Sequence, residues 1–150
     1  TNVTHYKIHG ALNNMAAEDE ELAMAAARAV KAVGPELLFL VPPKSALESV
    51  GQKIGLRVAR EIFADRAYDD DAMLVRRGTP GAMIEDPDEA AERIVRFVQN
   101  GAIESLSGKS IKVQIDSICV HGDGPSAVAM SQAVRSALIA AGITVKPMAA

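Results

Sequence analysis

The chain has 150 residues, of which 49% are apolar and 23% are charged, and its net charge at pH 7 is -3. This length fits one domain with a substantial core. The absence of a basic stripe and an aromatic content of 3% argue against nucleic-acid binding, and no apolar run reaches the ~18 residues of a membrane span. Because the single Cys119 cannot form an internal disulfide, we expect a cytoplasmic protein.

Strand-like and helix-like segments alternate along the chain. In chain order, the pattern predicts a strand at 3–10, a helix at 18–34, a strand at 36–41, a helix at 45–55 with a Ser45–Glu48 capping box, a strand at 56–64, an irregular loop at 68–86, a helix at 86–101, a strand at 111–120, a helix at 125–142 and a strand at 143–147. This alternation predicts an α/β fold with mostly parallel strands, either an open doubly wound sheet or part of a β/α barrel.

Polar side chains cluster directly after three of the predicted strands. In both α/β architectures, ligands bind at the carboxyl ends of the strands. We therefore expect these side chains to share one edge of the sheet. They are Lys7 and His9 after the first strand, Asp65, Arg66 and Tyr68 after the third, and His121 and Asp123 after the fourth.

Each of these clusters also has a purely structural interpretation. His9 fits a hydrogen-bonded histidine at a strand end, and Asp65 with Arg66 fits a structural ion pair. His121 and Asp123 fit a tight turn in which Asp123 caps the following helix.

Two further features point to binding or support of a site. Asp116 interrupts the apolar run 111–120, and a carboxylate inside a buried strand must be paired, hydrogen-bonded or functional. Arg76 and Arg77, in the loop 68–86, have the geometry to hold an anion, although a solvated surface loop explains them equally well. No P-loop, GxGxxG, CxxC or HExxH motif occurs, so no nucleotide or metal signature is visible.

Three segments carry distinctive motifs, namely "HYKIHGALNN" (5–14), "REIFADRAYDDDAMLVRRGTPGAMIED" (60–86) and "DSICVHGDGPSAV" (116–128). Together they resemble the LamB/YcsF family, the lactam utilisation proteins that form the A subunit of 5-oxoprolinase. Their order matches the family pattern KPHGALY, EVFADRAY, LVPRS-PGA and DSICVHGD. Ile8 replaces the family proline, Asn13 the tyrosine, Arg76 a second proline and Gly78 the serine, whereas Arg77 matches the family arginine.

The resemblance implies an irregular, TIM-like β/α barrel of the glycoside hydrolase/deacetylase type. Residues 1–150 would be a single β/α domain that forms the C-terminal half of that barrel. A half-barrel exposes a sheet edge. We therefore expect a companion N-terminal fragment or a homo-oligomer.

The resemblance also implies a function, the ATP-dependent cleavage of 5-oxo-L-proline to L-glutamate together with subunits B and C. ATP would be the co-substrate, accompanied by Mg²⁺, and the metal ligands are not identified. The implied catalytic residues are Asp65, His121, Asp123 and His9, and the implied substrate- or phosphate-binding residues are Lys7, Arg66, Tyr68, Arg77 and Asp116.

Two alternatives belong to other functional classes. The first is a divalent-metal-dependent, deacetylase-like amide hydrolase with His9, His121 and Asp123 as ligands. The second is a non-catalytic scaffold subunit of a lactamase complex.

Overall fold

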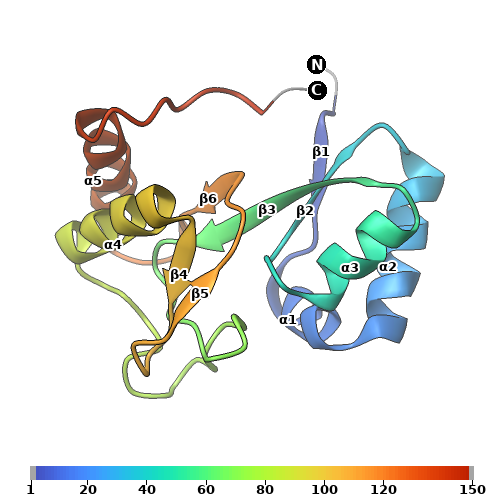
Figure 1. The fold of residues 1–150 in the computed structure, drawn as a ribbon, viewed down its shortest axis with the longest axis horizontal. Coiled ribbons are helices and arrows are strands. Elements are labelled where there is room, and N and C mark those ends of the chain that lie inside the picture. Colours follow the sequence, from blue (N-terminus) through green and yellow to red (C-terminus); the bar gives the residue numbers. More distant parts are fainter. Residues whose placement is uncertain (1–2, 149–150) are drawn as a thin grey trace. The chain divides into compact units, whose positions relative to one another are not determined.

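The computed structural model describes residues 3–148, in which helices alternate with strands for most of the chain (Figure 1). The main sheet has the strand order β1-β2-β3-β6, with β1–β2 and β2–β3 paired in parallel, and β4 and β5 form a separate antiparallel pair. The elements are β1 (His5–Lys7), α1 (Gly10–Glu18), α2 (Glu20–Val33), β2 (Leu38–Val41), α3 (Ala46–Lys53), β3 (Arg57–Phe63), α4 (Pro87–Asn100), β4 (Ala102–Glu104), β5 (Ser110–Lys112), β6 (Ser117–Cys119) and α5 (Ala127–Ala140).

Contacts divide the described chain into two compact units. The first unit contains the residues up to Glu61 together with Ile115–Ser117. The second contains Ile62–Gln114 and Ile118–Met148. Strand β3 passes from the first unit into the second, and the single domain expected for residues 1–150 stays a prediction.

The core of the first unit lies between α1, α2, α3 and one face of the strands. Ala23, Ala27 and Val30 recur at helical spacing along α2 and are buried against Phe39 of β2. The predicted helix 18–34 therefore exists, but it begins at Glu20, because the Asp19 side chain accepts the N–H of Leu22 at 3.0 Å and caps it.

Helix α1 was not predicted from the sequence. Its buried residues Asn13, Ala16 and Ala17 are spaced as one face of a helix, so the periodicity was present. The asparagine pair 13–14 and the lack of a capping side chain at His9 made this signal weak. His9 instead precedes the helix with an extended backbone, and its side chain makes no capping hydrogen bond.

The predicted capping box of α3 is half formed. Ser45 Oγ accepts the backbone N–H of Glu48 at 3.1 Å, as expected. Glu48 does not return the bond to Ser45, because its Oε2 accepts the N–H of Lys44 at 2.7 Å. Its other oxygen, Oε1, accepts from Arg60 Nε at 2.7 Å, so this helix start is tied to β3.

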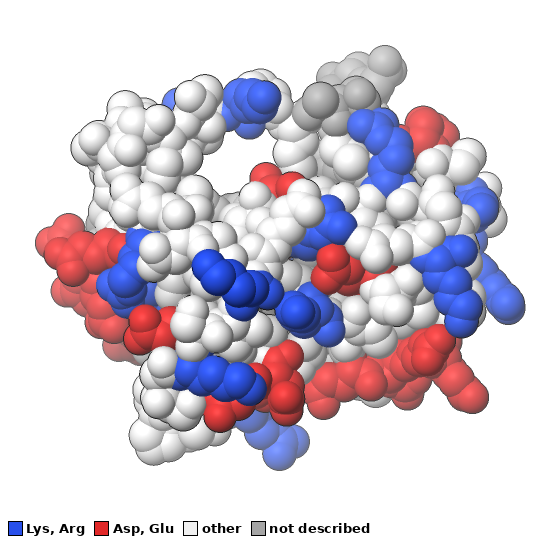
Figure 2. Space-filling model, viewed as in Figure 1, with Lys and Arg blue, Asp and Glu red and all other residues white. Residues whose placement is uncertain are grey.

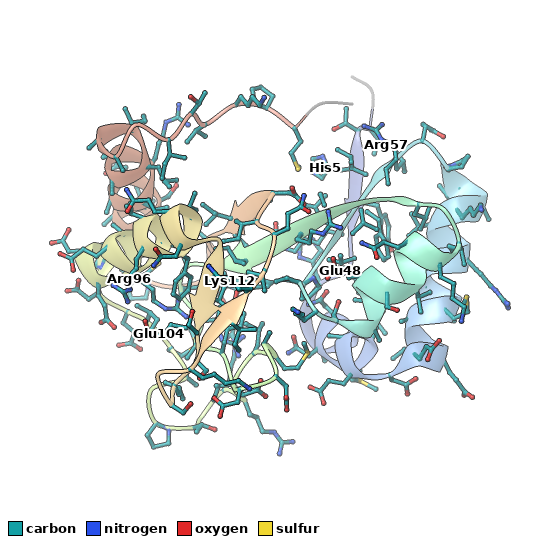
Figure 3. All side chains as sticks on the ribbon, in the orientation of Figure 1. His5, Glu48, Arg57, Arg96, Glu104 and Lys112 are labelled. Atoms are coloured by element: carbon teal, nitrogen blue, oxygen red, sulfur yellow. The ribbon has the colours of Figure 1, made fainter. Side chains whose placement is uncertain are left out.

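The core of the second unit lies between α4 and α5 and beneath the β4–β5 pair. Helix α4 starts and stops as predicted, because Asp86 accepts two backbone N–H groups and Gly101 adopts the left-handed conformation with φ 56°. Helix α5 buries Met130, Val134 and Leu138 along one face. On the exposed side, Arg96 Nε lies 3.7 Å from Glu104 Oε2 (Figure 3).

Two strand predictions were wrong. The predicted strand 111–120 is two strands, because Ser110–Lys112 pairs with Ala102–Glu104 and only Ser117–Cys119 joins the main sheet. Between them, the carboxylate of Asp116 accepts the N–H of Arg60 at 2.9 Å, so a side chain replaces a regular ladder contact. The predicted strand 143–147 is not a strand, since the chain closes the end of α5 with an Ile143 N–H to Leu138 O bond at 2.9 Å and then continues without pairing.

The loop between β3 and α4 has no regular secondary structure, as predicted, and the loop 105–109 packs on it. Asp70 Oδ1 accepts from Ser105 Oγ at 2.5 Å and from Ser107 Oγ at 2.6 Å. Lys109 Nζ donates to the Asp70 carbonyl at 2.8 Å. These bonds join two segments that are far apart in the sequence.

We predict a pH dependence of stability from Asp70. The hydrogen bonds from Ser105 and Ser107 lower the pKa of Asp70 in the folded state. A lowered carboxyl pKa stabilises the fold above the unfolded pKa of about 4, and this contribution is lost as the pH falls through the folded pKa. Asp70→Asn should therefore reduce the fall in melting temperature below about pH 4, and Ser107→Ala should reduce it less. An unchanged profile in Asp70→Asn would contradict this prediction.

Charged side chains of both signs are interspersed over the face shown in Figure 2. Within residues 3–148, no helix combines the length and the apolar character needed to cross a bilayer.

Candidate functional site

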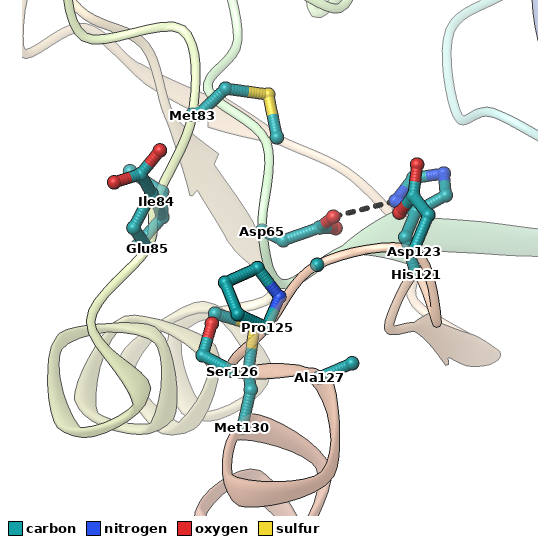
Figure 4. A pocket seen from close by; sticks show the side chains of 11 residues that line it. Asp65, Met83, Ile84, Glu85, His121, Asp123, Pro125, Ser126, Ala127 and Met130 are labelled. Carbon is teal, nitrogen blue, oxygen red and sulfur yellow. Dashed lines mark hydrogen bonds and ion pairs between the residues drawn. The ribbon is translucent and has the colours of Figure 1, made fainter.

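The carboxylate of Asp65 and the ring of His121 meet in the second unit. Asp65 follows the end of β3 and His121 follows the end of β6, so two neighbouring strands deliver the two side chains. His121 Nδ1 lies 2.6 Å from Asp65 Oδ2 (Figure 4). The carboxylate oxygen can accept a hydrogen bond from Nδ1, and in the neutral tautomer that carries its proton on Nδ1 the lone pair of Nε2 is free.

Asp65 is largely buried, and only one of its two carboxylate oxygens has a hydrogen-bond partner among the described residues. Its side chain is 10% exposed, against 31% for His121. Its second oxygen, Oδ1, is buried and has no hydrogen-bond partner in the part of the chain that the structure describes. Buried acceptors are normally satisfied, so this oxygen calls for an explanation such as a catalytic role or a bound water or ion.

Two further contacts hold the pair in place. The ring of Phe63 stacks on the ring of His121 with a centroid distance of 5.5 Å and an interplanar angle of 13°. The Ala64 N–H donates to the Cys119 carbonyl at 2.9 Å and links the ends of β3 and β6. The pairing of the two strand ends therefore brings the carboxylate and the imidazole close together.

A cavity of about 330 Å³ opens beside this pair. Its walls come from three segments of the second unit, the loop before α4, the turn after β6 and the first turn of α5, as the close view in Figure 4 shows. The volume suits a small molecule. The lining residues are Asp65, Met83, Ile84, Glu85, His121, Asp123, Gly124, Pro125, Ser126, Ala127 and Met130.

Asp123 lies at the rim of this cavity. Its Oδ2 is 3.6 Å from Arg77 Nη1, and both side chains are more than half exposed. The interpretation of Asp123 as a helix cap was wrong, because Ser126 occupies the N-cap position of α5 and no side chain caps that end. Asp123 instead connects the turn after β6 to the long loop.

Arg66 is a buried cation close to a second cation. Its Nη2 donates to the Val75 carbonyl at 2.6 Å, whereas its buried Nε has no hydrogen-bond partner among residues 3–148. Burial, and then the positive charge of Arg77, lower the pKa of Arg66. Within the described residues Arg66 and Asp65 are not at ion-pair distance, although the negative charge of Asp65 acts to raise the pKa of Arg66.

Tyr68 is 1% exposed, and its hydroxyl accepts the Phe63 N–H at 2.8 Å. The ring is therefore part of the core of the second unit and does not line the cavity. Tyr68 is linked to His121 indirectly, because its hydroxyl binds the backbone of Phe63 and the ring of Phe63 stacks on His121.

The first unit contains the other predicted residues. Lys7 forms an ion pair with Glu61, and Ser117 Oγ donates to Glu61 Oε1 at 3.5 Å. Lys7 is in register with Leu40, and Leu40 with Ala59, so Lys7 and Glu61 lie on the same face of the sheet. His9 is exposed at the start of α1.

Asp116 belongs to a charged network of the first unit. Its Oδ2 lies 3.3 Å from Arg60 Nη1, and Arg60 also binds Glu48. The hydrogen bond from Glu48 is the main cause that raises the pKa of Arg60. The structure places Asp116 in a network that supports β3, one of the two interpretations that the sequence left open.

Sequence reasoning missed two residues of these clusters. Glu61 is 6% exposed and sits inside the apolar end of β3, so a charged residue within "REIF" was the available signal. Arg93, in α4, is 8% exposed and contacts the backbone before Asp65. On a helical wheel Arg93 shares a face with Ala90 and Phe97, which was the signal for its burial.

The described residues do not form a metal centre of their own. Between residues 3 and 148, no group of three or more His, Cys, Asp or Glu side chains is placed to hold a metal ion. His121 Nδ1 is already hydrogen-bonded to Asp65, and the carboxylate of Asp123 lies next to Arg77, so neither group forms part of a metal centre built by the described residues alone. A magnesium ion can be held mainly by nucleotide phosphates and water, with one or two protein carboxylates. Asp65 and Asp123 could supply carboxylates of this kind, but the described residues supply no complete set of ligands.

The chain has close relatives of known sequence and structure. A model of the LamB/YcsF family matches residues 1–150. The 5-oxoprolinase A subunit of Rhodopseudomonas palustris (strain BisB18) is 53% identical over 147 residues, which cover 98% of this chain and 58% of that protein. The 5-oxoprolinase A subunit of Nitrobacter hamburgensis is 48% identical over 145 residues, covering 97% and 57%.

A solved structure matches as well. The lactam utilization protein from Thermus thermophilus is 43% identical, with a TM-score of 0.86 over 95% of this chain and 57% of that chain. The prediction of an α/β fold that forms part of a β/α barrel with parallel strands is thereby confirmed. The chain spans somewhat more than half the length of the relatives it matches.

Proposed function

Because this chain belongs to the LamB/YcsF family, we propose that it acts in the A subunit of an ATP-dependent 5-oxoprolinase, which cleaves 5-oxo-L-proline to L-glutamate. The names of the relatives support a role as a 5-oxoprolinase subunit in lactam utilisation. The observation that carries the proposal is the 2.6 Å contact between Asp65 and His121 beside a cavity of about 330 Å³. This arrangement offers an oriented base next to room for one small cyclic substrate.

The chemistry explains why ATP would be needed. A five-membered lactam is a stable amide, and its carbonyl resists attack by water. Transfer of the γ-phosphoryl group to the carbonyl oxygen releases ADP and activates the carbon. One water then adds, the ring C–N bond breaks with a proton passing to nitrogen, and a second water hydrolyses the acyl phosphate to glutamate and inorganic phosphate.

In this scheme His121 is the general base. Asp65 holds the imidazole with Nδ1–H toward the carboxylate, which leaves Nε2 to take a proton from the attacking water. The free Oδ1 of Asp65 gives a bound N–H or water a partner. We assign Asp123 to the rim, where its contact with Arg77 orders the long loop beside the cavity.

Arg66 and Arg77 are the proposed phosphate-binding pair. Burial, and then the positive charge of Arg77, lower the pKa of Arg66, so an anion bound between the two guanidinium groups would stabilise the charged form of Arg66. Lys7 and His9 stay predicted as substrate-binding and catalytic residues of the first unit. For Tyr68 and Asp116, the contacts support positioning roles, since each holds backbone of β3.

ATP would bring a Mg²⁺ ion held chiefly by its phosphates. When bound, the ion would neutralise phosphate charge during transfer. The subunit designation of the relatives supports partner subunits, which we propose to be B and C, in the cytoplasm.

The test is a coupled assay of the intact protein with and without subunits B and C. We expect equimolar release of glutamate and ADP from 5-oxoproline and ATP by the assembled complex. Glutamate release without ADP would contradict the coupling to ATP. A complex that opens a different lactam or amide but leaves 5-oxoproline intact would contradict the substrate, and full activity of B and C alone would favour a scaffold.

A further inference from the structure

Arg93 is a buried cation in α4 whose role the proposed reaction does not explain. It is 8% exposed, and within residues 3–148 no carboxylate lies at ion-pair distance from it. Burial lowers the pKa of Arg93, because removal from water disfavours the charged form. An unpaired buried charge is expensive, so its contacts must compensate for the loss of water.

The hydrogen bonds of Arg93 go to the backbone that precedes Asp65. Arg93 Nη1 donates to the carbonyl oxygens of Phe63 at 3.4 Å and Ala64 at 3.3 Å. The guanidinium lies over the ring of Phe97, 4.6 Å from its centroid, and 5.6 Å from the centroid of Tyr68. The two aromatic faces stabilise the cation and fix its plane.

Tyr68 binds the N–H of Phe63, the residue whose carbonyl binds Arg93. Its hydroxyl accepts the Phe63 N–H at 2.8 Å, so both the N–H and the carbonyl of Phe63 have fixed partners. The Ala64 N–H is bound to Cys119. The segment 63–64, which carries the ring against His121 and leads into Asp65, is therefore clamped by side chains from α4 and from the long loop.

We propose that Arg93 is a positioning residue that, together with Tyr68, sets the distance between Asp65 and His121. A 2.6 Å contact between side chains from two strands tolerates little displacement of either backbone. One guanidinium nitrogen, Nη1, donates to both carbonyls while the flat face of the group lies over Phe97. The ammonium of lysine could make the hydrogen bonds but has no planar face to fix its orientation. The contacts of Arg93 support its positioning role by themselves, whereas the effect on turnover rests on the proposed 5-oxoprolinase activity.

The first test observes the His121 ring directly. In the intact protein, nuclear magnetic resonance should show a downfield His121 Nδ1–H proton that is protected by Asp65. Arg93→Met, which keeps the apolar volume but removes the donors, should broaden or shift this resonance upfield, and Arg93→Lys should restore part of it. Arg96→Met, three residues along α4 at a half-exposed position, is the matched control and should leave it unchanged.

The second test measures catalysis in the complex with subunits B and C. Arg93→Met should lower kcat by roughly 10²-fold, because small misplacements of a catalytic group have effects of this size, while KM changes little. Tyr68→Phe keeps the ring and removes the hydroxyl that accepts the Phe63 N–H, so it should shift the His121 resonance in the same direction even where Arg93→Met does not fold. A folded Arg93→Met, or a Tyr68→Phe, with the wild-type His121 resonance overturns the proposal. If the wild-type complex does not act on 5-oxoproline, the resonance still decides the positional claim.

Discussion

Replacing His121 by glutamine should lower the turnover of 5-oxoproline by roughly 10²–10⁴-fold, the range expected for loss of a general base. Glutamine can still donate a hydrogen bond toward Asp65 and can still pack against Phe63. It cannot take a proton from water at neutral pH. The loss should therefore appear in kcat, whereas the melting temperature and the circular dichroism spectrum should stay close to those of the wild type.

The control for this substitution is His5→Gln. His5 is exposed in β1, where its Nδ1 lies 3.0 Å from Thr4 Oγ1, and no role is assigned to it. It should retain full turnover in the same assembled complex. A folded His121→Gln complex that releases glutamate and ADP at the wild-type rate would remove His121 from the reaction.

Lys7→Met should lower the free energy of unfolding by about 3–5 kcal/mol, because it leaves the buried carboxylate of Glu61 without its cationic partner. The side chains are 16% and 8% exposed, so little water reaches the remaining charge. The measurement is urea denaturation at neutral pH. The double variant Lys7→Met/Glu61→Leu should recover much of the loss, since it removes both charges and keeps the apolar volume.

The surface pair Lys53–Glu20 provides the matched control. Its atoms are 3.4 Å apart, but its side chains are 64% and 70% exposed. Lys53→Met should therefore cost less than about 1 kcal/mol. An equal, small loss for Lys7→Met and Lys53→Met would show that the buried pair contributes no more than a surface pair.

Local signals in the sequence predicted most elements whose ends are set by neighbouring residues. Asp86 and Gly101 delimit α4 through their own side chain and backbone conformation, and Ser45 does so for α3. The failures are segments decided by distant contacts. The sequence of 111–120 predicts one strand. In the structure, β4 pairs with its first part, and Arg60 donates to Asp116 just before its second part, so the stretch forms two strands.

The same distinction applies to the candidate site. The rule that chemistry collects at the carboxyl ends of parallel strands grouped His9 with Asp65 and His121, but only Asp65 and His121 line the cavity, whereas His9 belongs to the first unit. It did not reveal Arg93, because the contact of a helical residue with backbone carbonyls 29 and 30 positions away has no signature in sequence. Nor did it show that Tyr68 points into the core, since an aromatic residue near a strand end fits either location.

If the lactam is opened beside the Asp65–His121 pair, a crystal structure of the intact protein with subunits B and C, 5-oxoproline and a non-hydrolysable ATP analogue should show where it binds. We expect the lactam ring in the cavity beside α5, with His121 Nε2 facing its carbonyl carbon through one water. A lactam bound elsewhere, with this cavity holding only solvent, would contradict it.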